Sequence, residues 1–175
     1  MQGTGKPKEM NINSEQSMSR LYLVRHGEAK PKDEDPARGL TEVGRADVSG
    51  MAAWAAAADI RVDEIRHSGK LRARQTAEIL AEHLGTKSQA IPGLAPNDDP
   101  AVIAVAINSE ASNIMLVGHL PFLERLAALL IVGTKASSIV TLDAAALLEL
   151  TRSDEGWTAT CLMLPRLMPG RRERR

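Results

Sequence analysis

The segment LYLVRHGEAK, residues 21–30, joins a short apolar run to a charged and polar ending. Its first four residues are mostly apolar and are typical of a buried β-strand. Arg25, His26 and Gly27 follow directly. Such a strand end either faces solvent or presents its cation and imidazole for chemistry, and the other segments of the chain decide between these alternatives.

Outside this segment the chain alternates β-like runs with helical stretches. We expect strands at RLYLVRH (20–26), VDEIRHS (62–68), 89–91 and NIMLVGH (113–119), and a hairpin of AALLELT (145–151) and WTATCLML (157–164). We expect helices over 40–60 and 69–85, a third beginning at Pro100, and a fourth over 121–133. Alternating strands and helices form βαβ units, so the sequence predicts an α/β fold: a three-layer α/β/α sandwich around a mostly parallel sheet.

Several residues are placed to begin or end these helices. Thr41 and Ser68 are expected to cap the first two helices, and Gly85 is expected to end the second. Asp99 is expected to cap the third helix, with Pro100 in its first turn.

The overall composition argues against two classes of partner. Lys and Arg total 22, and Asp and Glu also total 22, so no net field attracts nucleic acid or an anionic membrane. Aromatic residues make up 2% of the chain, which leaves few rings to stack on bases. We therefore expect neither nucleic acid nor a membrane as a partner.

The expected location is the cytoplasm. The single cysteine, Cys161, lies in the apolar segment TATCLML, which predicts a core thiol in a reducing compartment. No apolar run approaches the roughly 20 residues that span a bilayer. We expect residues 1–19 to be a flexible leader without the apolar block of a secretory signal, residues 20–165 to form one domain, and residues 166–175 to be a basic tail.

Polar residues end three of the expected strands. Arg25 and His26 end the first, His67 and Ser68 end the second, and His119 ends NIMLVGH. In parallel α/β sheets, ligands bind beyond the carboxyl ends of the strands. These side chains are therefore expected to meet at one edge of the sheet.

Two histidines and several arginines suit phosphate chemistry. Arginine forks match phosphate oxygens, and a neutral imidazole nitrogen is a nucleophile at phosphorus as well as a metal ligand. A metal site would add acidic or thiolate ligands at fixed spacing, but no HxH or HExxH motif occurs and Cys161 is remote. We expect a phosphate site without a metal.

Three segments carry a resemblance to a known family. LVRHGE (23–28), LRARQTAEIL (71–80) and LVGHLPFLERL (116–126) resemble segments of the histidine phosphatase superfamily, also called phosphoglycerate mutase-like. Each follows an expected strand, in the order of the family, and together they cover roughly residues 20–165. Arg38 before LTEVG also resembles the RPLTxxG element of SixA-type phosphohistidine phosphatases, with Gly39 in place of the proline.

The resemblance implies a role for each matching residue. His26 would attack phosphorus and become a phosphohistidine that water later hydrolyses. Arg25, Arg38 and Arg72 would hold the phosphoryl oxygens, and His119 would donate a hydrogen bond to the developing charge. No cofactor or metal is implied, and the arginines should keep His26 neutral by like-charge repulsion.

A missing insertion bears on the substrate. Superfamily members that cleave alkoxide esters usually carry a carboxylic acid in an insertion after the third strand, where this chain has only AIPGLAPNDDP (90–100). Asp98 is a possible acid, although Asp98 and Asp99 also fit helix capping before Pro100. A phosphoimidazole is a better leaving group and needs less acid catalysis, and a site without a lid is open to a protein surface.

We therefore expect a signalling protein that carries phosphohistidine, such as a histidine-containing phosphotransfer domain, as the substrate. A small phosphate ester is an alternative with the same chemistry. A non-catalytic phosphate-binding or interaction module is an alternative of another class. Glu28 and Thr76 could orient site groups or satisfy local backbone donors, and His67 could line the rim or be structural.

Overall fold

Six strands and four helices make up the part of the chain that the structure describes, residues 19–134 and 139–168 of a computed structural model. In chain order they are β1 (Arg20–Arg25), α1 (Glu42–Ala57), β2 (Glu64–His67), α2 (Leu71–Leu84), β3 (Ser88–Ala90), α3 (Pro100–Asn108), β4 (Ile114–Gly118), α4 (Phe122–Val132), β5 (Leu147–Ser153) and β6 (Gly156–Met163), followed by a 3-10 turn, Pro165–Leu167.

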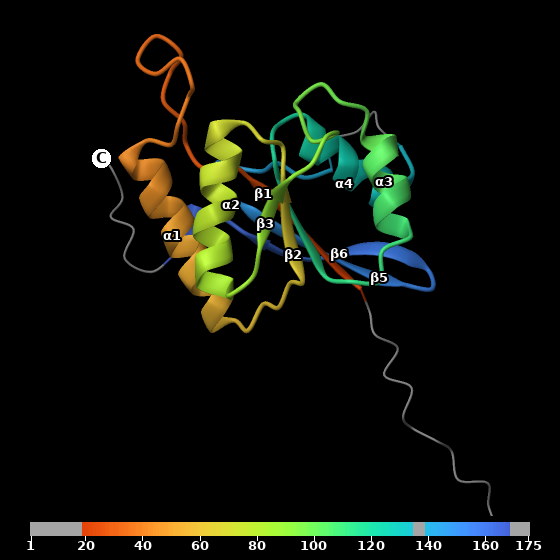
Figure 1. Cartoon of the computed structure of the whole chain (residues 1–175). Coiled ribbons are helices and arrows are strands. Elements are labelled where there is room, and N and C mark those ends of the chain that lie inside the picture. The colour runs from red at the N-terminus through yellow and green to blue at the C-terminus, as the bar shows by residue number, and fades with distance from the viewer. Residues whose placement is uncertain (1–18, 135–138, 169–175) are drawn as a thin grey trace, which may run out of the picture.

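The strands form a single sheet in the order β3-β2-β4-β1-β5-β6. Strands β3, β2, β4 and β1 are parallel to one another, whereas β5 and β6 join antiparallel as the expected hairpin. Helices α1 and α2 lie on one side of the sheet and α3 and α4 on the other (Figure 1). The α/β sandwich predicted from the sequence is therefore confirmed, with a mixed sheet.

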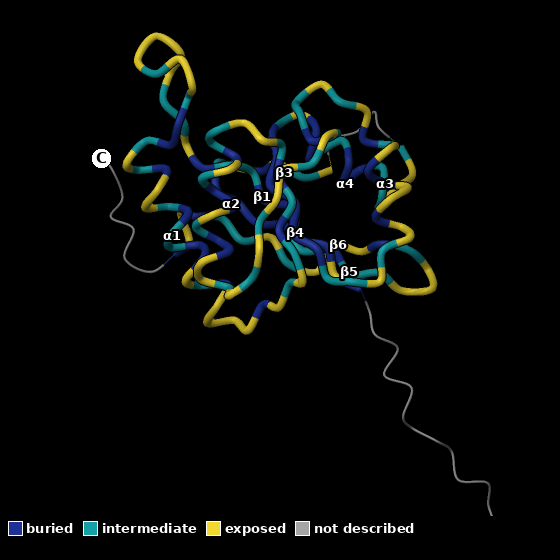
Figure 2. Tube along the Cα trace, viewed as in Figure 1, coloured by how far each residue is buried: buried dark blue, intermediate teal, exposed yellow. Residues whose placement is uncertain are grey.

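Two apolar clusters fill the space between the sheet and its helices. One includes Val24, Met51 and Leu80 beneath α1 and α2, and the other includes Leu116 and Leu126 beneath α3 and α4. All five residues of β4 are buried, because this strand has neighbours on both sides and helices on both faces. Figure 2 shows the same separation of a buried sheet from exposed helix surfaces and loops.

Local signals predicted most helix ends correctly. The side chain of Thr41 accepts a hydrogen bond from the Gly44 amide, and the side chain of Asp99 accepts one from the Ala101 amide. Gly85 ends α2 in the left-handed region, at φ 64°. These are the favoured residues at the first and last positions of helices.

Ser68 does not cap α2, so this prediction was wrong. The N-cap is Lys70, whose side chain makes no capping hydrogen bond. Gly69 takes φ 78°, and the chain makes a further bend before the helix begins at Leu71. Ser68 thus stays at the end of β2, where its hydroxyl has another partner.

Cys161 is not a core thiol, and this expectation was also wrong. It lies on β6, the last strand of the sheet, and is half-buried and free. Burial raises the pKa of its thiol. Sequence context showed an apolar segment but not that the segment lies at a sheet edge.

The predicted leader and tail fall mainly outside the described residues, which begin at Ser19 and end at Met168. Ser19 and Met168 are both buried against the domain. The limits of the domain stay predictions. Within the described ranges, none of the helices has the length and hydropathy to cross a membrane.

Candidate active site

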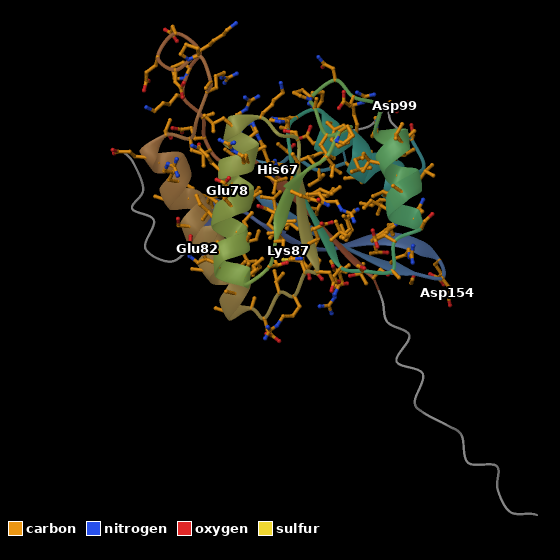
Figure 3. All side chains as sticks on the ribbon, viewed as in Figure 1. His67, Glu78, Glu82, Lys87, Asp99 and Asp154 are labelled. Carbon is orange, nitrogen blue, oxygen red and sulfur yellow. The ribbon has the colours of Figure 1, made fainter. Side chains whose placement is uncertain are left out.

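The carboxyl ends of three neighbouring strands bring the candidate residues together. Arg25 ends β1 and pairs in register with Gly118, the last residue of β4, while His67 ends β2 on the other side of β4. The amide of His26 donates to the carbonyl of Gly118 over 3.1 Å. In Figure 3, His67 marks the end of β2 and Asp99 marks the start of α3 near the same edge.

Hydrogen bonds determine which nitrogen of His26 carries the proton. Nδ1 lies 2.7 Å from the carbonyl oxygen of Gly27, so Nδ1 donates. Nε of Arg72 lies 3.1 Å from Nε2 and donates to it, so Nε2 holds the lone pair. Both contacts select one tautomer, in which Nε2 is the nucleophilic nitrogen.

The surroundings of His26 also keep it neutral. The pKa of His26 is lowered to about 4, chiefly by burial and additionally by the positive charges of Arg72, Arg25 and Arg38. The hydrogen bond to Gly27 acts in the opposite direction. At neutral pH the imidazole is therefore unprotonated on Nε2.

Three predicted arginines surround this ring. Nη1 of Arg25 donates to the carbonyl of Leu142 over 2.8 Å, while its buried Nε has no hydrogen-bond partner within the described chain. Arg38 lowers the pKa values of both His26 and Arg72. The arrangement concentrates positive charge around a neutral imidazole, which suits an anionic ligand.

The loop before α1 fixes Arg38 in an unusual conformation. Arg38 has φ 54°, a region that a non-glycine residue rarely adopts. The two carboxylate oxygens of Asp35 accept from the amides of Ala37 at 2.9 Å and Gly39 at 2.8 Å, and these bonds lower the pKa of Asp35. Sequence reasoning missed Asp35, although an Asp before a proline is a turn signal that could have identified it.

His119 lies beside His26. The centroids of the two rings are 4.8 Å apart, and the ring planes are inclined by 58°. The His119 side chain is buried, with Nε2 2.6 Å from Oγ of Ser68 and Nδ1 without a partner in the described part of the chain. Burial lowers its pKa to about 3, assisted by His26 and Arg72. Sequence reasoning missed the role of Ser68, because its partner is 51 residues away.

Two side chains of α2 attach the loops of the site to the helix. The buried hydroxyl of Thr76 accepts from the amide of Gly27 over 3.1 Å and donates to the carbonyl of Arg72 over 2.7 Å. Oε1 of Gln75 accepts from the amide of Leu40 over 2.8 Å. Thr76 therefore orients the site as well as satisfying a backbone donor.

Other candidates have local partners. Glu28 accepts from the hydroxyl of Thr41 over 2.9 Å, at the start of α1. Nδ1 of the buried His67 accepts from the amide of Gly69 over 3.1 Å, and burial lowers the His67 pKa. These contacts give Glu28 and His67 structural roles at the border of the site.

Asp98 lies in the loop between β3 and α3. Its Oδ2 accepts from the amide of Ala95 over 2.8 Å, so it stabilises a turn while Asp99 caps α3. The charged groups with the largest influence on the His26 pKa are Arg72, Arg25 and Arg38. Across the described residues, no group of three or more His, Cys, Asp or Glu side chains is arranged to hold a metal ion.

A site with a neutral, oriented imidazole and three arginines at the carboxyl edge of an α/β sheet defines a class of phosphoryl-transfer proteins. Residues 21–96 match the family model of the histidine phosphatase superfamily (branch 1). The matched segment is similar to the members of this superfamily and includes Arg25, His26, Arg38 and Arg72.

The individual relatives support the SixA-type branch. The chain is 29% identical over 137 residues to the phosphohistidine phosphatase SixA of Escherichia coli (strain K12). The alignment covers 70% of this chain and 85% of the relative. A solved structure described as a candidate SixA from Agrobacterium tumefaciens has 28% identity and a TM-score of 0.70, covering 84% of this chain and 98% of that one. These relatives support a phosphatase enzyme.

Further structures establish the fold alone. The protein histidine phosphatase SixA complexed with tungstate has a TM-score of 0.74 at 23% identity, over 84% of this chain and 97% of that one. A candidate alpha-ribazole-5'-P phosphatase from Escherichia coli has a TM-score of 0.68 at 18% identity, over 82% and 95%. The fold is therefore shared by phosphatases of different substrate classes.

Proposed function

We propose that this protein is a phosphatase that forms a covalent phosphohistidine at His26 and removes phosphate from phosphohistidine on a signalling protein. The single observation that carries the proposal is the orientation of His26. Its Nδ1 is anchored to the Gly27 carbonyl, and its Nε2 lone pair lies against the guanidinium of Arg72. A nucleophile held in one tautomer needs no proton removed before it attacks.

Two unpartnered buried nitrogens support an anion as the ligand. Nε of Arg25 and Nδ1 of His119 make no hydrogen bonds within the described residues. Buried polar groups in proteins nearly always have partners, so such nitrogens indicate a ligand with acceptor oxygens. With Arg38 and Arg72 they would form a clamp for the three oxygens of a transferring phosphoryl group.

The reaction divides into two displacements. The Nε2 lone pair of His26 forms a bond to phosphorus as the bond to the substrate nitrogen breaks, and the electron pair leaves with the substrate imidazole. Because the other nitrogen of that imidazole is protonated, it departs as a neutral ring. Water then attacks phosphorus, His26 recovers its electron pair, and the proton of the water leaves with inorganic phosphate.

The partner of the Asp98 carboxylate favours this substrate. Asp98 already accepts from the Ala95 amide, and the charges with the largest influence on the His26 pKa are those of arginines. A leaving imidazole needs less help from an acid than an alkoxide does. The partner we propose is a histidine phosphotransfer protein, and the similarity to the phosphohistidine phosphatase SixA of Escherichia coli supports phosphohistidine as the group that is cleaved.

Small phosphate esters are the second candidate, because similar folds include small-molecule phosphatases. This alternative keeps His26 as the nucleophile and makes Asp98 the acid. A non-catalytic phosphate-binding module is the third candidate, and the presence of Arg25, His26, Arg72 and His119 together argues against it. We also propose that the enzyme acts without a metal and in the cytoplasm.

The deciding experiment compares kcat/KM for a phosphohistidine protein with that for a panel of phosphomonoesters. We expect the phosphoprotein to be preferred, with an acid-labile phosphoenzyme that disappears in His26→Ala but persists in His83→Ala, a change in an exposed histidine of α2. A far higher kcat/KM for a small ester would identify the protein as a phosphatase of small phosphate esters, the second candidate. Full activity of His26→Ala would exclude the mechanism, and loss of activity in EDTA with recovery on adding a divalent metal would exclude metal independence.

A further inference from the structure

We propose that Ser68 is a positioning residue that sets the tautomer of His119. Its hydroxyl donates to Nε2 of His119, so that Nδ1 of His119 carries the proton and presents it to the ligand. The identity of that ligand as a phosphoryl group rests on the proposed function, whereas the tautomer itself does not.

The contact between these side chains is short, and its histidine side is buried. Oγ of Ser68 lies 2.6 Å from Nε2 of His119, and only 1% of His119 is exposed. Ser68 reaches the ring because Gly69 and Lys70 delay the start of α2, which leaves the serine at the end of β2. The serine and the histidine thus come from the ends of adjacent parallel strands.

A neutral imidazole has one proton, so the two possible arrangements have opposite consequences. If the hydroxyl of Ser68 donates, its proton has an acceptor and Nδ1 becomes an N–H donor. If Nε2 donates instead, the Ser68 hydroxyl has to direct its proton away from the ring, and Nδ1 becomes a buried bare lone pair. The first arrangement leaves a single donor to be satisfied, and an anion satisfies it.

The third possible state, a positively charged His119 with protons on both nitrogens, is not populated near neutral pH. Burial, His26, Arg72, Lys70 and Arg25 all lower the pKa of His119. The ring therefore does not carry protons on both nitrogens, and its capacity to donate from Nδ1 depends on what is bonded to Nε2.

The two histidines are then set by opposite partners. His26 donates a hydrogen bond from Nδ1 to the Gly27 carbonyl and keeps a lone pair at Nε2. His119 accepts a hydrogen bond at Nε2 from the hydroxyl of Ser68 and keeps an N–H at Nδ1. Both rings bear their proton on Nδ1, yet their free atoms differ. His26 can attack phosphorus with Nε2, while His119 can donate from Nδ1 to the phosphoryl oxygens.

The tautomer can be measured directly in the unliganded protein. In a long-range ¹H–¹⁵N spectrum at pH 7, we expect the His119 signals, identified by their loss in His119→Gln, to show a protonated Nδ1 and an unprotonated Nε2. Ser68→Ala should shift this pattern toward a protonated Nε2, and Ser68→Thr should preserve it. Ser109→Ala, which removes an exposed hydroxyl bonded to the Val105 carbonyl, should leave it unchanged. A protonated Nε2 in the wild-type protein would overturn the proposal without any variant.

Tungstate binding tests the consequence for the ligand. We expect Ser68→Ala to weaken tungstate binding and to lower kcat/KM by about tenfold, and Ser68→Thr to restore both. Unchanged tungstate affinity in Ser68→Ala, despite a changed tautomer, would overturn the positioning role. Failure of the wild-type protein both to bind tungstate and to turn over any phosphorylated substrate would overturn the proposed function instead, and the spectrum would still decide the tautomer.

Discussion

Nε of Arg72 donates a hydrogen bond to Nε2 of His26, which joins the first turn of α2 to the end of β1 across 46 residues of sequence. The bond places a cation on the nitrogen that would attack phosphorus. An incoming phosphoryl group offers the guanidinium better acceptors, so binding of the ligand would release the lone pair at the moment it is needed. In the proposed mechanism, Arg72 would hold the Nε2 lone pair of His26 in the free protein and would bind the phosphoryl oxygens once the ligand enters.

Replacement of Arg72 by lysine should lower kcat/KM by about 100-fold, because a point charge cannot contact the ring nitrogen and the phosphoryl oxygens as a planar fork does. The measurement is steady-state turnover of the preferred substrate. Arg74→Lys is the matched control, since Arg74 is two positions along the same helix, exposed, and paired with Glu78 over 3.6 Å. Equal losses in the two variants would contradict a specific role for Arg72.

The stability of the protein should fall on mild acidification. Folding lowers the pKa values of His26 and His119 from 6.5 to about 4 and about 3, so the unfolded chain binds more protons below pH 6.5. The stabilisation is complete above that pH and is lost as the pH falls toward these folded values, by up to about 1.4 kcal/mol per pH unit for each histidine. Urea unfolding in steps of about half a pH unit between about pH 7.5 and pH 4.5 would measure the slope of the free energy of unfolding against pH. The double variant His26→Gln/His119→Gln should have a shallower slope, and an unaltered slope would contradict the assignment.

The elements of the fold could be predicted because their signals are local. Thr41, Gly85 and Asp99 begin or end helices through contacts within four residues. The convergence of His26 and His119 followed from a general rule, namely that parallel strands share one carboxyl edge. Neither inference required knowledge of how side chains pack.

The parts that failed depend on distant contacts. A serine at position 68 is suitable both as a helix cap and as a hydrogen-bond partner of a histidine. Only the position of His119, after β4, shows which of the two roles Ser68 has. The exposure of Cys161 depends on the absence of a further strand beside β6 in the described sheet. The Asp35-Pro36 pair signals a turn, but it does not show that the turn holds Arg38 at the site, because the amides that Asp35 binds are identified only by the folded loop.

Loss of the Asp35 carboxylate should impair Arg38 without altering its charge. Asp35→Ala removes the acceptors for the amides of Ala37 and Gly39, which hold the loop at the left-handed conformation of Arg38. We expect KM for the phosphorylated substrate to rise several-fold, to about the value of an Arg38→Ala variant. Asp33→Ala removes an exposed carboxylate from the same loop and should leave KM unchanged. A rise in both variants would indicate a general effect of loop charge instead.

The hydroxyl of Thr76 should contribute to stability as well as to activity. Thr76→Val keeps the shape of the side chain but leaves the buried amide of Gly27 without its acceptor, at a cost of about 1–3 kcal/mol. Thr76→Ser retains the hydroxyl and should recover most of this loss. Urea unfolding of the two variants gives the comparison, and a Thr76→Val protein as stable as the wild type would contradict a stabilising role for this hydrogen bond.

Two glycines of α1 should respond oppositely to the same substitution. A Cβ on Gly44 would collide with the carbonyl oxygen of Glu28 and lie 2.8 Å from its amide nitrogen, both of them backbone atoms that cannot rotate away. A Cβ on Gly50 would meet nothing within 4 Å. We therefore expect Gly44→Ala to cost about 1–3 kcal/mol and Gly50→Ala to stabilise the helix by about 0.5–1 kcal/mol.

Because Glu28 follows Gly27 directly, Gly44→Ala should also displace the segment after His26 and lower kcat, whereas Gly50→Ala should leave kcat unchanged. Thermal unfolding and turnover of both variants test this close approach of α1 to the site, and a stable, fully active Gly44→Ala protein would show that the approach is not required.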